Sequence, residues 1–229
     1  MAALGLGIAA ACGGPVVPAA TETAPASGGA IVATTPGTAA RPFRELAGAA
    51  SASPYRVTYR VSSSAGGQAV SATQTWYVSG RNFRMDLGVA SAGGSGSFSV
   101  FVIPDGTYSC VTAAGASGTQ CFGMPQAQAY AQSPGAALDA EIRANPDAFG
   151  ATYRDTRTIA GTSASCYGIA GTAAGFSQGT ICYTSSGVPL LYQFDSSGLS
   201  FTMEATSFGV PTDADFRLPA PAQKIPGTP

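Results

Sequence analysis

Apolar and polar residues alternate through several short segments of this chain. Residues 55–62 read Tyr-Arg-Val-Thr-Tyr-Arg-Val-Ser, with the large apolar side chains at every second position. Such a period of two predicts a β-strand with one buried face. The pattern returns at 70–78, 83–87, 98–102 and 188–194, from Tyr153 onward through two cysteines, and most clearly at 199–206. Successive alternating segments joined by short turns predict an antiparallel sheet with a single apolar face.

Two segments lack this alternation and are the candidates to cover the apolar face. The sequence predicts a short helix at residues 41–50, with Pro42 in its first turn. Residues 124–149 are rich in Ala, Gln and Pro, are interrupted at Pro134, and place Leu138 and Ile142 one helical turn apart. We therefore expect two short helices in 124–149 and an α+β domain that is mainly β.

Four of the five cysteines fall within the alternating part of the chain. Pairing Cys110 with Cys121 and Cys166 with Cys182 closes two turn-like loops of hairpin length, and this pairing is favoured among the three that are possible. Disulfides place a protein in an oxidising, extracytoplasmic compartment. Four reduced, buried cysteines in a cytosolic protein are the alternative. A zinc site is disfavoured, because the chain has no Cys-x-x-Cys spacing and no histidine.

The fifth cysteine, Cys12, follows an apolar run at residues 2–11. This run is too short to cross a membrane but is typical of the core of a secretory signal. Small residues before a cysteine resemble a bacterial lipoprotein signal, in which that cysteine is lipidated. The sequence therefore predicts a signal segment at 1–12 and a lipid anchor on Cys12. An Ala-rich N-terminus with an incidental thiol is the alternative.

The remaining chain predicts one domain between two linker-like ends. Residues 13–40 contain a single charged residue among Pro, Ala, Thr, Ser and Gly, and such a segment buries too little surface to offset its ordering entropy. We expect a flexible linker at 13–40, one domain at 41–219 and a tail at 220–229.

Composition argues against several classes of function. Charged residues make up 10% of the chain and the net charge is −1, so no electrostatic footprint for nucleic acid exists. Without histidine, Ser-His and Cys-His catalytic pairs are absent. Asp213 and Asp215 are interpreted as turn residues, and Asp139 and Glu141 as side chains that face water. Residues 84–86 and 154–157 are interpreted as outward-facing strand residues rather than anion sites. We therefore predict no enzyme, no cofactor and no metal.

Several motifs, taken in order, resemble the LolA/LolB-type lipoprotein carrier superfamily, which includes LppX and LprG. They are the opening strand at 55–61, Trp-Tyr-Val at 76–78 leading to Asn-Phe-Arg-Met-Asp at 82–86, and the ending Pro-Thr-Asp-Ala-Asp-Phe-Arg-Leu-Pro at 211–219. The resemblance covers roughly residues 42–219. It implies a strongly curved antiparallel half-barrel, with helices on its concave side and an apolar cavity between them that takes acyl chains.

The predicted function is therefore that of a membrane-anchored extracytoplasmic lipoprotein that binds or carries a lipid or another hydrophobic molecule. Small residues in the covering segment leave room beneath it, although an aromatic and Met-rich face is also typical of a packed core. The alternative is an envelope interaction or sensor module with an envelope protein as partner and no lipid ligand. The candidate cavity-lining residues are Val57, Tyr59, Trp76, Phe83, Met85, Phe98, Val100, Leu138, Ile142, Leu199, Phe201 and Met203.

Overall fold

The computed structural model describes residues 41–49, 53–65, 68–91, 94–126, 134–170, 178–196 and 199–223. Contacts within the chain separate residues 1–37 from a compact unit of residues 38–229. The predicted signal segment, Cys12 and the linker at 13–40 lie outside the described residues, as do 127–133 and 224–229. The account below concerns the described residues of the second unit.

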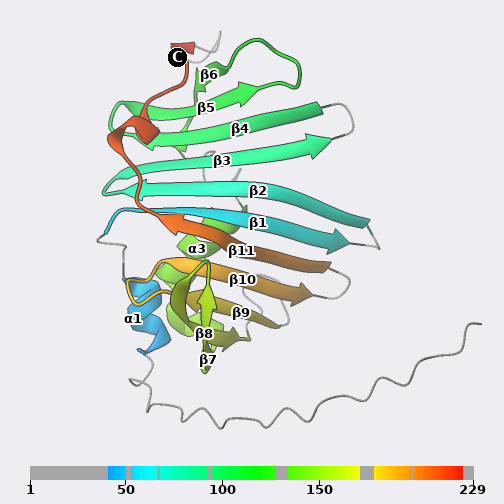
Figure 1. Cartoon of the computed structure of the whole chain (residues 1–229). Helices are drawn as coiled ribbons and strands as arrows, with labels where there is room; N and C mark the ends of the chain where they lie inside the picture. The colour runs from blue at the N-terminus through cyan, green and yellow to red at the C-terminus, as the bar shows by residue number, and fades with distance from the viewer. Residues whose placement is uncertain are drawn as a thin grey trace, which may run out of the picture. The chain divides into compact units, whose positions relative to one another are not determined.

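These residues form a large, open, curved sheet that is antiparallel throughout except at one edge (Figure 1). The order across this 12-stranded sheet is β12-β6-β5-β4-β3-β2-β1-β11-β10-β9-β8-β7, and only the pair of β12 with β6 is parallel. The strands are β1 Tyr55–Ala65, β2 Gln68–Ser79, β3 Asn82–Ser91, β4 Gly94–Ile103, β5 Gly106–Thr112, β6 Gln120–Gly123, β7 Thr152–Ile159, β8 Thr162–Ile169, β9 Gln178–Tyr183, β10 Pro189–Ser196, β11 Leu199–Gly209 and β12 Ala222–Gln223.

Cross-strand register places the alternating apolar residues of the sequence on one common face. Val57 on β1 is paired with Trp76 on β2, Trp76 with Met85 on β3, and Met85 with Val100 on β4. Each of these side chains is at most 1% exposed. This row confirms the predicted strands and their sidedness, because residues directly opposite each other in a ladder share a face.

Two α-helices are described, and both pack on this face, which we call the helix face. On α1, Phe43–Gly48, the ring of Phe43 lies 5.3 Å from that of Tyr167 on β8. Gly135, at the start of α3 (Pro134–Ala144), lies against Met203 and Trp76, while a 3-10 helix, η1, spans Pro146–Phe149. No helix among the described residues is long and apolar enough to cross a membrane. The helix expected at 41–50 is confirmed. Of the two expected in 124–149, α3 is described, and it begins at the expected interruption.

The opposite face of the sheet is also partly covered, which the alternation did not predict. Phe101, Cys110 and Cys121 form a separate buried cluster with Leu218 and Ala220 packed against it. The residues that follow β11 form η2, a 3-10 helix at Asp213–Phe216, and then run to β12 beside β6 (Figure 1). A single apolar face was therefore too simple a prediction, because the chain beyond β11 returns across the other side.

Both disulfides of the favoured pairing are present. Cys110 on β5 is bonded to its cross-strand partner Cys121 on β6, and Cys166 on β8 to Cys182 on β9. The local pairing expected from the short loops is confirmed.

Candidate functional site

Most of the predicted lining residues lie together on the helix face. Val57, Tyr59, Trp76, Met85, Val100, Leu138, Ile142 and Met203 are buried members of one core cluster, and Phe83, Phe98 and Phe201 are half-buried against it. Leu199 is different, because it is the first residue of β11 and 40% of its surface is exposed. The sheet residues and the α3 residues thus share one apolar layer.

The apolar side chains of the helix face are not equally buried in all strands. The apolar side chains of β8 to β10 that lie beneath α1 and α3 are buried, whereas several apolar side chains of β1 to β4 and β11 keep part of their surface exposed. We call these half-buried residues the apolar band: Val61, Val78, Phe83, Phe98, Val102 and Phe201. The band flanks the buried row of Val57, Trp76, Met85 and Val100 on both sides of the same face and leaves apolar surface within reach of a ligand.

The approach of α3 to the sheet depends on Gly135. A Cβ atom at this position would lie 2.9 Å from Sδ of Met203 and 3.2 Å from a ring carbon of Trp76. Trp76 is 1% exposed, and its indole Nε1 makes no hydrogen bond. Burying such a donor without a partner costs on the order of 1–3 kcal/mol, so an acceptor supplied by a ligand would offset a real penalty.

A polar cluster fixes α3 to its neighbours at the margin of this apolar layer. Arg143 donates to the carboxylate of Asp139 at 2.6 Å and to the carbonyl oxygens of Ala47, Ala49 and Gly187 at 3.0 to 3.1 Å. One guanidinium thus joins α3, the end of α1 and the turn between β9 and β10. The expectation that Asp139 faces water is wrong, because its side chain is 13% exposed and paired with Arg143; Glu141 is exposed.

Three buried tyrosines surround the Asp139–Arg143 pair. The hydroxyl of Tyr192 donates to Asp139, and that of Tyr59 donates to the carbonyl of Pro189 at 2.8 Å. Burial, with a further contribution from the Asp139 charge, raises the pKa of Tyr59, Tyr183 and Tyr192 above its usual range. Burial alone would lower the pKa of Arg143, but the Asp139 carboxylate outweighs it and raises that pKa. The three tyrosines are therefore neutral, and Arg143 is charged, at physiological pH.

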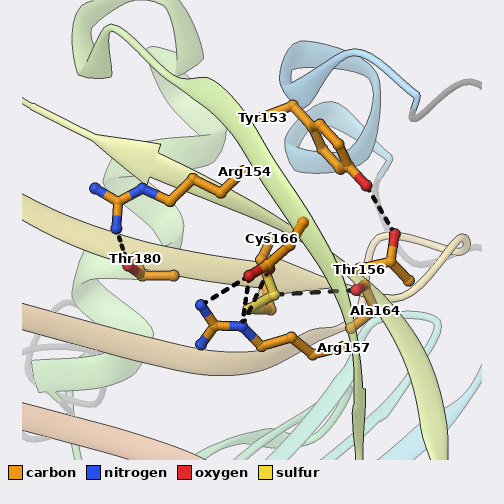
Figure 2. A network of polar contacts seen from close by, with 9 residues as sticks. Tyr153, Arg154, Thr156, Arg157, Ala164, Cys166 and Thr180 are labelled. Carbon is orange, nitrogen blue, oxygen red and sulfur yellow. Dashed lines mark hydrogen bonds and ion pairs between the residues drawn. A yellow bond between two sulfur atoms is a disulfide. The ribbon is translucent and has the colours of Figure 1, made fainter. Parts of the chain in front are cut away.

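A second concavity lies on the opposite face, between β7 and the strands β9 and β10. It is open to solvent, has a volume of about 200 Å³ and is lined mainly by polar groups. Figure 2 shows the guanidinium of Arg154 reaching Thr180, the contact that spans the pocket at 3.2 Å. The lining residues are Arg154, Arg157, Gln178, Gly179, Thr180, Gln193 and Asp195.

The polar residues that the sequence assigned to turns or outward faces have mixed outcomes. Asp215 caps η2, accepting hydrogen bonds from the backbone and the hydroxyl of Thr212, and these lower its pKa; the turn interpretation is confirmed. Arg84 packs over the ring of Tyr77 and pairs with Asp86, which is a structural role. No group of His, Cys, Asp and Glu side chains in the described part of the chain is arranged to hold a metal ion.

The participation of Arg143 and Arg154 was missed because their sequence signals are ambiguous. Arg143 follows Asp139 by one helical turn, which predicts an ordinary surface pair, and nothing local shows that carbonyl groups of two other elements meet it. Arg154 lies in a run of alternating charges that is typical of a solvated strand. The one usable signal is Gly168, since a glycine inside a strand often marks a close approach by another group.

Comparison with known proteins gives matches of fold only. No family model matches the sequence, and no curated protein is significantly similar to it. LprF from Mycobacterium bovis is 12% identical with a TM-score of 0.49, covering 78% of this chain and 97% of that one. A LolA superfamily protein from Nitrosomonas europaea is 10% identical with a TM-score of 0.34, covering 78% and 99%.

The structure of a MucA/MucB complex from Pseudomonas aeruginosa is a further match, at 12% identity and a TM-score of 0.47. It covers 77% of this chain, which spans 58% of the length of that one. One of these matched structures is thus a member of the superfamily that the sequence motifs resemble. At these identities and TM-scores, the matches give no information about a ligand, a partner or an activity.

Proposed function

We propose that this protein is a membrane-anchored extracytoplasmic lipoprotein that binds a hydrophobic molecule between its sheet and the helices on the helix face. The observation that carries the proposal is the apolar band, which extends the core across β1 to β4 and β11 with side chains only half-buried. The two disulfides support an oxidising compartment. The lining residues proposed for this site are those predicted from the sequence, with Leu199 at its outer edge.

Binding would come from removing apolar surface from water, at about 0.8 kcal/mol for each buried methylene. An acyl chain lying across β2 to β4 would cover Val78, Phe83 and Val102, which are paired in one cross-strand row. The unpartnered indole N–H of Trp76 supports a ligand that also carries an acceptor near its chain, such as an ester carbonyl. Met85 and Met203, on the same face, adapt to ligands of varied shape.

A titration with a fluorescent fatty acid tests this site on delipidated protein. We expect saturable binding, and at least a tenfold loss of affinity in Phe83→Glu, because the carboxylate places a charge within the apolar band. Val210→Glu is the control, since Val210 lies just beyond β11 and is already 69% exposed. Equal affinities for the two variants and the wild type, with both folded by circular dichroism, would show that the band does not bind the ligand.

The lipid anchor requires its own measurement, because Cys12 lies outside the described residues. Mass spectrometry of the N-terminal peptide from membrane-extracted protein should find Cys12 as the first residue with added acyl mass. An unmodified Cys12 preceded by residues 1–11 would refute the anchor and leave the ligand site untouched.

A further inference from the structure

The polar pocket on the face opposite the helices is built by an irregularity in β7. Tyr153 is paired with Tyr167 and Asp155 with Cys166, so Arg154 is an extra residue between two regular pairs. Such a β-bulge redirects a side chain. Here it lets Arg154 reach Thr180, the cross-strand partner of Gly168, and so places Arg154 in the pocket that Arg157 also lines.

Gly168 provides the space in which the Arg154 side chain lies. A Cβ atom on Gly168 would be 2.8 Å from Cζ and 2.8 Å from Nη2 of Arg154, with Nε closer still. The guanidinium therefore lies directly over the β8 backbone, and any side chain at position 168 would displace it. Beyond Gly168 it meets the hydroxyl of Thr180, which is 6% exposed and fixed in the floor of the pocket.

The charges around the pocket leave Arg154 available for a ligand. Arg157 is paired with Asp155 on its own strand at 3.1 Å. None of the ion pairs found among the described residues includes Arg154. Its guanidinium has five N–H donors, of which the contact with Thr180 uses one. Gln178, Gln193 and Asp195 on β9 and β10 line the pocket as well.

We propose that this pocket binds a small hydroxylated carboxylate, with Arg154 receiving the carboxylate. A guanidinium matches a carboxylate through two parallel hydrogen bonds, which gives geometric specificity as well as affinity. Gln178 and Gln193 supply amide groups for the hydroxyls of the ligand. The volume of about 200 Å³ suits one acid of the size of a monosaccharide. The pocket lies on the opposite face from the apolar band and does not depend on the function proposed there.

A titration followed by NMR tests the pocket, with D-glucuronate as the probe and D-glucose as its neutral counterpart. Glucuronate should bind saturably with a Kd of about 1 mM, with shifts centred on β7, β9 and β10, and glucose at least tenfold more weakly. Arg154→Gln should weaken glucuronate binding at least tenfold. Arg60→Gln, an exposed arginine on β1 outside the pocket, should leave it unchanged.

Gly168→Ala tests positioning without removing a charge. The added methyl displaces the Arg154 guanidinium, so binding should again fall at least tenfold, while the unfolding temperature stays near that of the wild type because alanine suits a strand as well as glycine. The proposal is overturned if glucose binds as tightly as glucuronate, if no saturable binding occurs, or if either pocket variant retains the wild-type affinity.

Discussion

Replacing Arg143 tests how α3 is held against the sheet. Arg143→Met removes the partner of a carboxylate that is 13% exposed, and it leaves the carbonyl groups of Ala47, Ala49 and Gly187 without their donor. Breaking a buried pair by removing one partner costs about 3 to 5 kcal/mol, and each unsatisfied buried carbonyl adds to that loss. Because the Arg143 side chain itself is 21% exposed, water offsets part of the loss. We expect a decrease of about 3 kcal/mol in the free energy of unfolding.

Chemical and thermal unfolding measure this decrease. For a domain of this size, it corresponds to a Tm lower by about 10 °C. The Tm of Arg143→Lys should lie between those of the wild type and Arg143→Met, because one ammonium cannot reach the carboxylate and three carbonyls together. The control is Arg44→Met, which breaks the Arg44–Asp147 pair, whose two side chains are each 69% exposed, and it should leave the Tm unchanged. Equal effects of Arg143→Met and Arg44→Met would refute the structural role given to the buried pair.

Other predictions concern charge, cross-links and capping. The pKa of Tyr59 and Tyr192 is raised in the folded protein, so the free energy of unfolding should fall as the pH rises above about 10. Absorbance should show that these two phenols ionise only as the protein unfolds. Ionisation of all tyrosines before unfolding would contradict their burial. Replacing Cys166 and Cys182 by alanine, which opens a loop of sequence separation 16, should lower the free energy of unfolding by about 3 kcal/mol in denaturant titrations. Asp215, whose folded pKa is lowered, should stabilise the wild type over Asp215→Asn above about pH 4 and lose this advantage below it; a difference that persists in acid would show that the charge plays no part.

Sidedness along the strands was predictable, because alternation directly records which face meets water. The pairing of Val57 with Trp76 and of Trp76 with Met85 follows from hairpins whose turns were visible in the sequence. The disulfides followed from short loops. What alternation cannot record is which segment covers a face, so the return of Leu218 and Ala220 across Phe101 was not predicted.

The polar pocket could not be predicted from the sequence, for a more specific reason. A bulge shifts the pairing by one residue and sends side chains on either side of it to different faces, so Arg154 looks like any residue of a solvated strand. Its contact with Thr180 crosses a whole strand, which local spacing does not reveal. Likewise Asp139 was assigned to water because only the tertiary structure brings Tyr192 to it.

The central claim is that the helix face holds a hydrophobic ligand in the native protein. Native mass spectrometry of the full chain, gently extracted from its own membrane, tests it most directly. We expect a reproducible adduct on the wild-type protein. Organic solvent should extract it, and mass spectrometry should identify it as an acyl-containing or similarly apolar molecule. The amount of this adduct should be lower in Phe83→Glu. A protein that is consistently free of such adducts, and that gains none when incubated with fatty acid, would contradict the account.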